Sequence, residues 1–373
     1  MSEEAAKYRA PNDHAIIVGI NRYRLKNDIP ELLGAVNDAT LFHEWTISSR
    51  GGGLNPENSH LLVSPKEAGP FEPFRDDIED EIFEFYNRSY ETGGRVGRRL
   101  YLFMAGHGVA PADGDDCSLV LGNTPLNPYR VLTGRLTAER VFRQPLFEEV
   151  VLFMACCRDV SGAGSHTGLP PAGESLPNAR YFHGLAAKWK KRALEKQLPH
   201  PFDARKDPLW QSVFTHSLLL GLNSAVDSAG RITALSVRDF VKKQVLNLVP
   251  QDQKFAPPFF LDEDAPAIVF REAEAVAAAH GGAASPHVES PSALAVNSTP
   301  APALIPVDVA LGDPAAVLSV LDGADLSPRD VQPEPIGDGK YRIHLPPGLY
   351  AFNAGPGLSV PVRVLGEALN VNL

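Results

Sequence analysis

The sequence predicts an α/β fold, with a mostly parallel sheet flanked by helices, followed by a small all-β domain of the sandwich type. Two apolar runs, at residues 100–104 and 150–154, contain no polar alternation, which is typical of strands buried on both faces of a parallel sheet. Segments with helical spacing lie between the apolar runs and indicate βαβ units with right-handed crossovers. Beyond residue 305, short alternating runs separated by Gly and Pro turns favour a β-sandwich.

The composition divides the 373 residues into three parts. Residues 1–271 carry the α/β pattern, and residues 304–373 carry the short β runs. Residues 272–303 are dominated by Ala, Ser, Pro, Gly and Glu and are expected to form a linker. The length also exceeds that of one ordinary domain, so we expect two folded domains joined by this linker.

The first half of the α/β part is expected to alternate strands with helices. Residues 14–20 are almost entirely apolar and predict the first buried strand. From Leu32 onward, apolar residues recur at roughly helical spacing. After a short strand at residues 59–63, residues 77–86 place apolar side chains on one helical face and acids on the other. The strand at residues 100–104 follows.

The second half is expected to continue the sheet and to add two longer helices. Residues 161–179 are rich in Gly, Pro and Ser and predict a mobile loop, and residues 182–198 are expected to begin extended and then turn helical. Ser236 is a suitable N-cap for a helix at residues 237–248. The other expected elements are a strand at 118–121, a helix at 137–144, the strand at 150–154, a helix at 208–223 and a last strand of the sheet at 267–270.

Charge and apolar content exclude several classes of function. The net charge of −10 and the absence of a long Lys/Arg run argue against a nucleic-acid-binding surface. The one basic cluster, residues 188–192, is interpreted as the solvated face of a helix. No run of 18 apolar residues occurs and the N-terminus has no secretory signal, so we expect no membrane partner.

The cysteine content indicates a reducing compartment. Three cysteines, of which Cys156 and Cys157 are adjacent, give no disulfide framework. We therefore expect a cytoplasmic protein. No CxxC, HExxH or EF-hand pattern is present, so neither a metal nor a cofactor is expected. Two acidic stretches, residues 113–116 and 262–264, are interpreted as solvated loops rather than calcium sites.

Two of the apolar runs stop at a reactive side chain. The run at 100–104 leads into Gly106, His107 and Gly108, and the run at 150–154 leads into Cys156 and Cys157. Ligands of open α/β sheets bind beyond the carboxyl ends of the strands, so a shared site is expected there. His107 precedes Cys157 by 50 residues, the order and approximate spacing of the caspase signature.

Six motifs occur along residues 12–272 in the order found in one protein family. In these motifs the chain resembles the caspase-like cysteine peptidases, in particular the prokaryotic metacaspase-like branch. They are HAIIVGINRY at 14–23, LLGAVNDATLF at 32–42, LYLFMAGHG at 100–108, VVLFMACCRD at 150–159, FHGLAAKWKKRALE at 182–195 and VFTHSLLLGLNSAVDSAGRITALSVRDFV at 213–241.

The resemblance implies a cysteine endopeptidase acting on protein or peptide substrates through a thioacyl-enzyme. Its dyad would be His107 and Cys157, and the oxyanion donors would be the backbone N–H groups of Gly108 and Cys157. A thiol becomes nucleophilic when a neighbouring His removes its proton. Taken alone, Cys157 is more simply a buried structural cysteine. Strand alternation points Cys156 to the other face, where it is expected to join the core.

The sequence does not decide which residue is preferred at the P1 position of the substrate. Peptidases of this branch that cleave after Arg or Lys carry an acid two residues before the nucleophile, where this chain has Ala155, and a Ser where it has Ala105. Asp38 matches the family position linked to a basic P1 pocket. It is either a buried carboxylate facing that pocket or a helix-surface acid.

Two further expectations concern regulation and an alternative function. The resemblance implies a zymogen cut in residues 161–179 or 188–192. The alternative to a peptidase is a catalytically silent interaction module that keeps the fold and binds a partner through its C-terminal β domain. The Ala residues at 155 and 105 motivate this alternative.

Overall fold

The computed structural model describes residues 8–65, 69–112, 116–125, 129–160, 165–170, 173, 178–203, 205–262, 266–272, 305–310, 318–322, 331, 333–337, 339–345, 348–353, 359–364 and 369–372. The chain forms two compact units, Met1–Gly282 and Ala283–Leu373. Of the expected linker, only Glu272 lies within the described residues.

A six-stranded sheet forms the centre of the first unit, in the order β13-β9-β7-β3-β1-β2. All neighbours in it are parallel except the β13–β9 pair, which is antiparallel. The predicted fold class, a mostly parallel sheet flanked by helices, is confirmed. Its strands are β1 (Asp13–Gly19), β2 (Ser59–Val63), β3 (Gly97–Gly106), β7 (Phe147–Cys156), β9 (Arg180–Leu185) and β13 (Phe259–Leu261).

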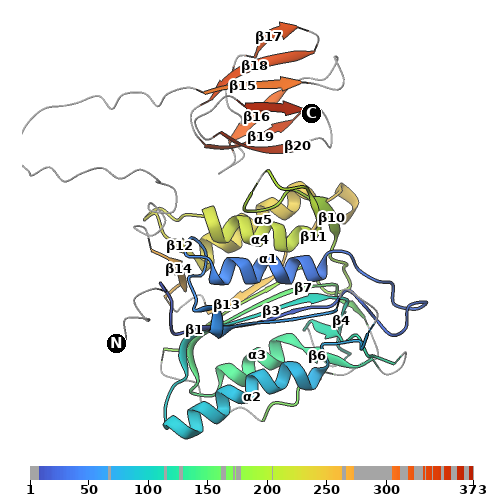
Figure 1. Ribbon diagram of the computed structural model, residues 1–373, viewed down its shortest axis with the longest axis vertical. Helices are drawn as coiled ribbons and strands as arrows, with labels where there is room; N and C mark the ends of the chain where they lie inside the picture. Colours follow the sequence, from blue (N-terminus) through green and yellow to red (C-terminus); the bar gives the residue numbers. More distant parts are fainter. Residues whose placement is uncertain are drawn as a thin grey trace, which may run out of the picture. The chain divides into compact units, whose positions relative to one another are not determined.

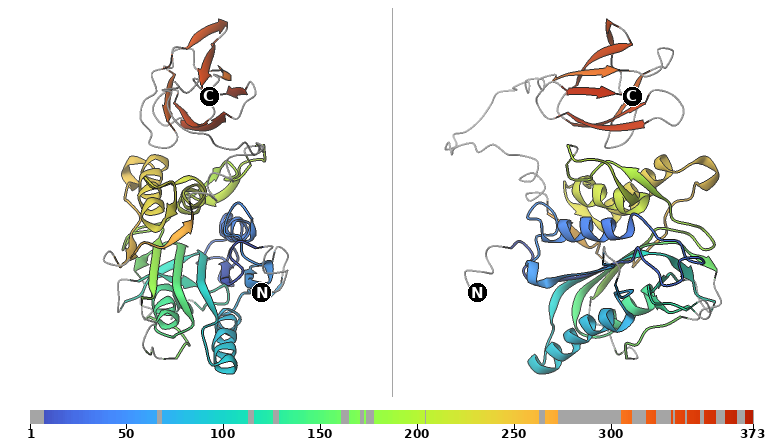
Figure 2. Two further views of the ribbon diagram at one scale, coloured as in Figure 1. Left: turned by 90° about the vertical axis from the view of Figure 1, so that its left-hand side faces the viewer. Right: turned by 45° about the vertical axis from the view of Figure 1, so that its right-hand side comes forward.

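Helices cover both faces of this sheet (Figure 1). On one face lie α1 (Ala35–Ile47), α4 (Val213–Ser224) and α5 (Ala234–Leu248), and on the other α2 (Arg75–Thr92) and α3 (Gly134–Phe142). The turned views of Figure 2 show the same two helical layers. Within β3, Tyr101 and Phe103 pack toward the first layer, whereas Leu100, Leu102 and Met104 pack toward the second. Burial of both faces explains the apolar runs without alternation.

Smaller sheets surround the central one. Strands β4 (Gly108–Ala110), β5 (Ser118–Val120), β6 (Val131–Thr133) and β8 (Asp159–Val160) form a four-stranded sheet in the order β6-β5-β4-β8. Two-stranded sheets join β10 (Glu195–Leu198) with β11 (Leu209–Ser212), and β12 (Ile232–Thr233) with β14 (Val269–Arg271). The β4–β8 pair continues the chain directly after β3 and β7, so this small sheet lies where the candidate site is expected.

Four local predictions are wrong. The helix expected at residues 208–223 begins only at Val213, because residues 209–212 form strand β11. Residues 182–198 contain no helix: β9 is followed by turns and then by β10, so the basic cluster at 188–192 lies on irregular backbone. Thr233, not Ser236, caps α5, because Ser236 stands at the third helical position of a capping box. Strand β14, expected as the last strand of the central sheet, pairs with β12 instead, and β13 is the edge.

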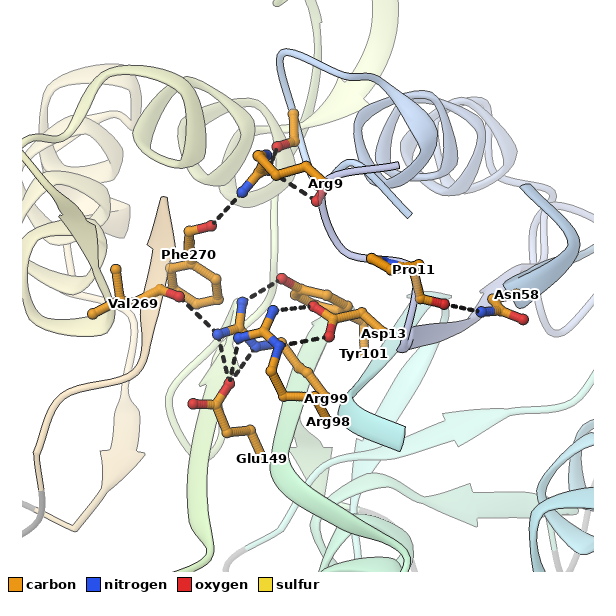
Figure 3. A network of polar contacts seen from close by, with 12 residues as sticks. Arg9, Pro11, Asp13, Asn58, Arg98, Arg99, Tyr101, Glu149, Val269 and Phe270 are labelled. Carbon is orange, nitrogen blue, oxygen red and sulfur yellow. Dashed lines mark hydrogen bonds and ion pairs between the residues drawn. The ribbon is translucent and has the colours of Figure 1, made fainter. Parts of the chain in front are cut away.

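A polar network closes the amino-terminal ends of β3 and β7 (Figure 3). The Arg99 guanidinium is bonded to the carboxylate of Glu149, the hydroxyl of Tyr101 and the carbonyl of Val269. Arg98 pairs with Asp13 on β1. These bonds attach the segment around β14 to the start of the central sheet, at the end opposite to the carboxyl ends of its strands.

The second unit is all β in its described residues, as predicted. One sheet has the order β17-β18-β15-β21 and the other β16-β19-β20. Both contribute to one apolar core, as in a sandwich: Val307, Ile343 and Val371 come from the first sheet, and Val320 and Phe352 from the second. The strands are β15 (Ile305–Ala310), β16 (Ser319–Asp322), β17 (Glu334–Gly337), β18 (Lys340–Leu345), β19 (Gly348–Asn353), β20 (Ser359–Val364) and β21 (Leu369–Asn372).

Within the part of the chain that the structure describes, no helix combines the length and the apolar character that a bilayer span requires.

Candidate active site

The parallel pairing of β3 with β7 brings the two predicted reactive residues to neighbouring strand ends. Gly106 lies opposite Cys156 in the register, and Ala105 lies opposite Ala155. His107 and Cys157 are therefore the first residues beyond one matched pair. The shared register, rather than chance proximity in a loop, places both residues at the carboxyl edge of the sheet, where α/β folds bind ligands.

The His107 ring is held in one orientation. Its Nε2 lies 2.8 Å from the carbonyl oxygen of Pro30 and donates to it, which leaves Nδ1 as the unprotonated nitrogen. The backbone N–H of His107 donates to the hydroxyl of Tyr23 at 2.7 Å, and the two rings lie 4.9 Å apart. Tyr23 is fully buried and in turn donates to the carbonyl of Ile20. The ring is therefore presented with a free acceptor nitrogen.

Burial determines the protonation of His107. Loss of solvent lowers its pKa below the ordinary value of 6.5, and the nearby Arg192 acts in the same direction, whereas the Pro30 hydrogen bond and Asp159 raise it. The net effect is a lowered pKa. At neutral pH the imidazole is thus uncharged and able to accept a proton.

Cys157 is a partly buried thiol rather than a preformed thiolate. Burial raises its pKa to about 11, and its Sγ donates to the carbonyl of Ala193 at 3.8 Å. No hydrogen bond joins Cys157 directly to His107 among the described residues. Cys156, by contrast, is fully buried, with its Sγ 3.5 Å from the carbonyl of Met104, which confirms that it belongs to the core. Of this adjacent pair, Cys157 is the accessible one.

Gly108 allows the backbone of β4 to approach the Cys157 peptide. A Cβ placed on Gly108 would lie 2.5 Å from the carbonyl oxygen of Cys157 and 2.5 Å from the Cβ of Cys156. Any side chain at this position would force the two segments apart. The expected oxyanion donors, the N–H groups of Gly108 and Cys157, consequently belong to two backbone segments in van der Waals contact.

Arg158, which the sequence did not single out as functional, anchors the segment opposite Cys157. Its buried guanidinium donates to the carbonyls of Asp116 and Ala187. Its backbone N–H donates to the carbonyl of Lys191 at 2.9 Å, and its carbonyl accepts from the N–H of Lys190 at 3.0 Å. Residues 187–193 are therefore fixed beside Cys157, the candidate nucleophile. The only sign of this arrangement in the sequence is that Arg158 directly follows Cys157.

Asp38 is a buried carboxylate, so the interpretation as a helix-surface acid is wrong. It is 1% exposed, and both of its oxygens accept from the backbone N–H of Ser212, at 3.0 and 3.2 Å. Burial raises its pKa well above the usual value, although bonds from Ser212 and Thr215 act against this. Ala155, the second-last residue of β7, has only a methyl side chain and lies in the apolar core on the α1 face.

Glu195 is a second acid near the site and was missed in the sequence. Its two carboxylate oxygens accept from the backbone N–H groups of Leu33, at 3.3 Å, and Gly34, at 3.1 Å. Partial burial raises its pKa, while the two hydrogen bonds lower it, with a net increase. The sequence shows that Glu195 follows Ala193 by two residues. It does not show that the Glu195 carboxylate binds the loop that contains Leu33 and Gly34.

A mostly apolar pocket lies next to the Ala193 segment. Of its lining residues, only Arg192 and Gln253 are not apolar. Because Ala193 also contacts the Cys157 thiol, the pocket is adjacent to the candidate nucleophile. The apolar lining residues are Ala186, Ala193, Leu194, Val213, Phe214, Val245, Val249 and Phe255.

In the described ranges, no three His, Cys, Asp or Glu side chains are grouped so that they could hold a metal ion. Residues 113–115 and 263–265, which include most of the two acidic stretches, lie outside those ranges.

Comparisons with known proteins add one structural likeness. No family model matches the chain, and neither does any curated protein. Among solved structures, the chain is similar to the crystal structure of caspase-1 from Spodoptera frugiperda, with 12% identity and a TM-score of 0.43, over 71% of this chain and 94% of that chain.

Proposed function

We propose that this protein is a cysteine endopeptidase of the caspase-like type, with His107 and Cys157 as its catalytic dyad. The observation that carries the proposal is the β3–β7 register, which sets both residues one position beyond a matched pair. The lowered pKa of His107 supports a role as general base. The assignment to the metacaspase-like branch, the cytoplasmic location and activation by cleavage are further parts of the proposal and rest on the motifs alone.

The reaction proceeds through an acyl-enzyme. His107 takes the thiol proton as the Cys157 Sγ attacks the carbonyl carbon of the peptide, and the N–H groups of Gly108 and Cys157 bind the oxyanion. The tetrahedral intermediate collapses to a thioester as the amine leaves with the proton from His107. Water, deprotonated by His107, then attacks the thioester carbonyl and releases the acid together with the free thiol.

The substrate is proposed to be a protein or peptide with an apolar residue near the scissile bond. The apolar pocket beside Ala193 supports this. A basic P1 residue is proposed as well, because Asp38 is a buried carboxyl group at the position that the motif resemblance links to a basic P1 pocket. Both Asp38 oxygens already accept from the backbone N–H of Ser212, so direct contact with a basic side chain would have to compete with these bonds.

A non-proteolytic interaction module is the second candidate. The resting thiol with a pKa of about 11, and the Ala residues at 105 and 155, favour it. Its partner would be a protein segment adding to the second unit, where β17 is an edge strand with exposed side chains, including Ile336.

The decisive experiment is cleavage of a fluorogenic peptide library that varies the P1 residue and the apolar residues beside it. We expect turnover by the wild type and by Cys156→Ala, and none by Cys157→Ala or His107→Ala. Absence of cleavage of the library and of an intact proteome by folded wild-type protein would favour the interaction module.

A further inference from the structure

One short segment contacts Cys157 directly and also the loop whose Pro30 carbonyl orients His107. Residues 193–195 lead into and begin β10. At its start, the Ala193 carbonyl accepts from the Cys157 thiol at 3.8 Å. At its end, the Glu195 carboxylate accepts from the N–H groups of Leu33 and Gly34. Those two residues belong to the loop that carries Pro30, whose carbonyl orients the His107 ring.

The contact between Glu195 and the loop is close on both sides. A Cβ on Gly34 would lie 2.9 Å from the Glu195 Oε1 and 3.0 Å from the Cα of Gln211. The loop thus needs a glycine at this position to reach the carboxylate. Other bonds also fix it, since the N–H of Leu32 donates to the carbonyl of Asn21 at 3.0 Å. Glu195 adds the connection to the segment that touches Cys157.

The charge of Glu195 has no cationic partner to explain it. None of the ion pairs among the described residues includes Glu195, and its pKa is shifted by burial and by two backbone hydrogen bonds rather than by a nearby cation. A half-buried carboxylate without a cation is costly unless hydrogen bonds compensate it. Two backbone N–H groups supply that compensation here, and hydrogen bonds to a charged acceptor are the stronger kind.

We infer that Glu195 is a positioning residue of the dyad: by holding the loop at residues 30–34, it keeps the Pro30 carbonyl on the Nε2 of His107 while its own segment holds the Cys157 thiol. This inference rests on the proposed peptidase function. It assigns to Glu195 no contact with substrate. Its removal is expected to loosen His107 rather than to alter the binding of the peptide.

The test compares Glu195→Gln and Glu195→Ala with the wild type and with Glu57→Gln, a matched change at an exposed acid. Nuclear magnetic resonance of the full chain, labelled at histidine, follows the Nε2–H signal and the pKa of His107. The Pro30 bond raises this pKa. We therefore expect the pKa of His107 to fall and its Nε2–H to exchange faster in Glu195→Ala, with a smaller change in Glu195→Gln, which keeps one acceptor oxygen.

Kinetics supply the second readout. For the peptide that is cleaved fastest, we expect kcat to fall by roughly tenfold in Glu195→Ala and KM to change less than about threefold. Complete loss of a general base lowers the rate by ~10²–10⁴-fold, and a base that is only loosened should cost less. Glu57→Gln should match the wild type. Thermal unfolding of each variant checks that the fold is kept.

Two results would overturn the inference. One is an unchanged His107 signal and pKa in folded Glu195→Ala. The other is a rise in KM for peptides with Arg or Lys near the scissile bond at unchanged kcat, which would make Glu195 a substrate-binding residue. Failure of the proposed peptidase function gives a different result, because the wild type would then cleave no peptide. The resonance of His107 would still show whether Glu195 positions the His107 ring.

Discussion

The Nε2 of His107 lies 2.8 Å from the carbonyl oxygen of Pro30, so the ring carries its proton on Nε2 and its Nδ1 is the unprotonated nitrogen. Together with the lowered pKa of His107 and the raised pKa of Cys157, this describes a neutral pair at rest. For the proposed peptidase, we expect proton transfer to accompany the attack on substrate instead of preceding it.

The first prediction concerns the state of the thiol. Iodoacetamide, which reacts with the thiolate, should alkylate Cys157 faster with increasing pH, with a midpoint near the pKa of about 11. Mass spectrometry of the quenched protein gives the rate constant at each pH. A plateau already present at pH 6 to 7 would instead indicate a thiolate–imidazolium pair.

The second prediction separates the two adjacent cysteines. Cys157→Ala should remove the alkylated peptide and all peptide cleavage, because Cys157 is the partly exposed thiol. Cys156→Ala should keep both and lose about 1 kcal/mol of unfolding free energy, since its buried Sγ packs in the core. Peptide mapping decides, and a label on Cys156 would contradict the assignment.

The third prediction tests the close approach of β4 to the nucleophile. Gly108→Ala should lower kcat by roughly 10²-fold, because the added Cβ pushes the Gly108 N–H away from the position of the oxyanion. Gly94→Ala is the matched control, since the nearest atom to its added Cβ is 4.0 Å away. Equal activity of both variants would remove Gly108 from the site.

The fourth prediction concerns the buried polar network. Arg99 and Glu149 are 1% and 2% exposed, whereas the neighbouring pair Arg95 and Glu148 is 48% and 40% exposed. Replacing Arg99 by Met leaves the buried Glu149 carboxylate paired with Arg180 and, at 3.7 Å, with Arg98, but it removes the donor to the Tyr101 hydroxyl and the Val269 carbonyl, so it should cost about 3 kcal/mol of unfolding free energy. Arg95→Met should change it by less than about 1 kcal/mol. Urea denaturation measures both, and equal losses would show that burial does not control the cost.

The fifth prediction is the pH dependence caused by His183. Neither ring nitrogen of this buried side chain has a hydrogen-bond partner among the described residues, and burial lowers its pKa to about 3. The unfolded chain takes up a proton near pH 6.5, whereas the folded protein does not. The fold therefore loses stability as the pH falls, by up to about 1.4 kcal/mol per unit between pH 6.5 and 3.

His183→Leu removes this acid-sensitive group. Its unfolding free energy, measured by urea denaturation between pH 7 and 4, should exceed that of the wild type by a margin that grows as the pH falls. A constant margin would mean that His183 takes up a proton as readily in the folded protein as in the unfolded chain.

The sequence by itself determined the central sheet and the ends of two of its strands. Doubly buried strands need long apolar runs, so β3 and β7 were visible, and the reactive residues directly after them had to lie at one edge of a parallel sheet. Strand alternation also separated Cys156 from Cys157 correctly. These inferences depend only on neighbours along the chain.

Tertiary structure decided what surrounds the dyad. Pro30 meets His107 across 77 residues, Glu195 meets Gly34 across 161, and Asp38 meets Ser212 across 174. It also decided that residues after β9 form turns and β10 rather than a helix, because β11 and the Arg158 backbone supply their hydrogen bonds. Hydrophobic periodicity indicates which side of a helix or strand is apolar. It does not indicate which distant groups will hydrogen-bond to a carboxylate or a carbonyl, because those partners are determined only when the helices and strands pack.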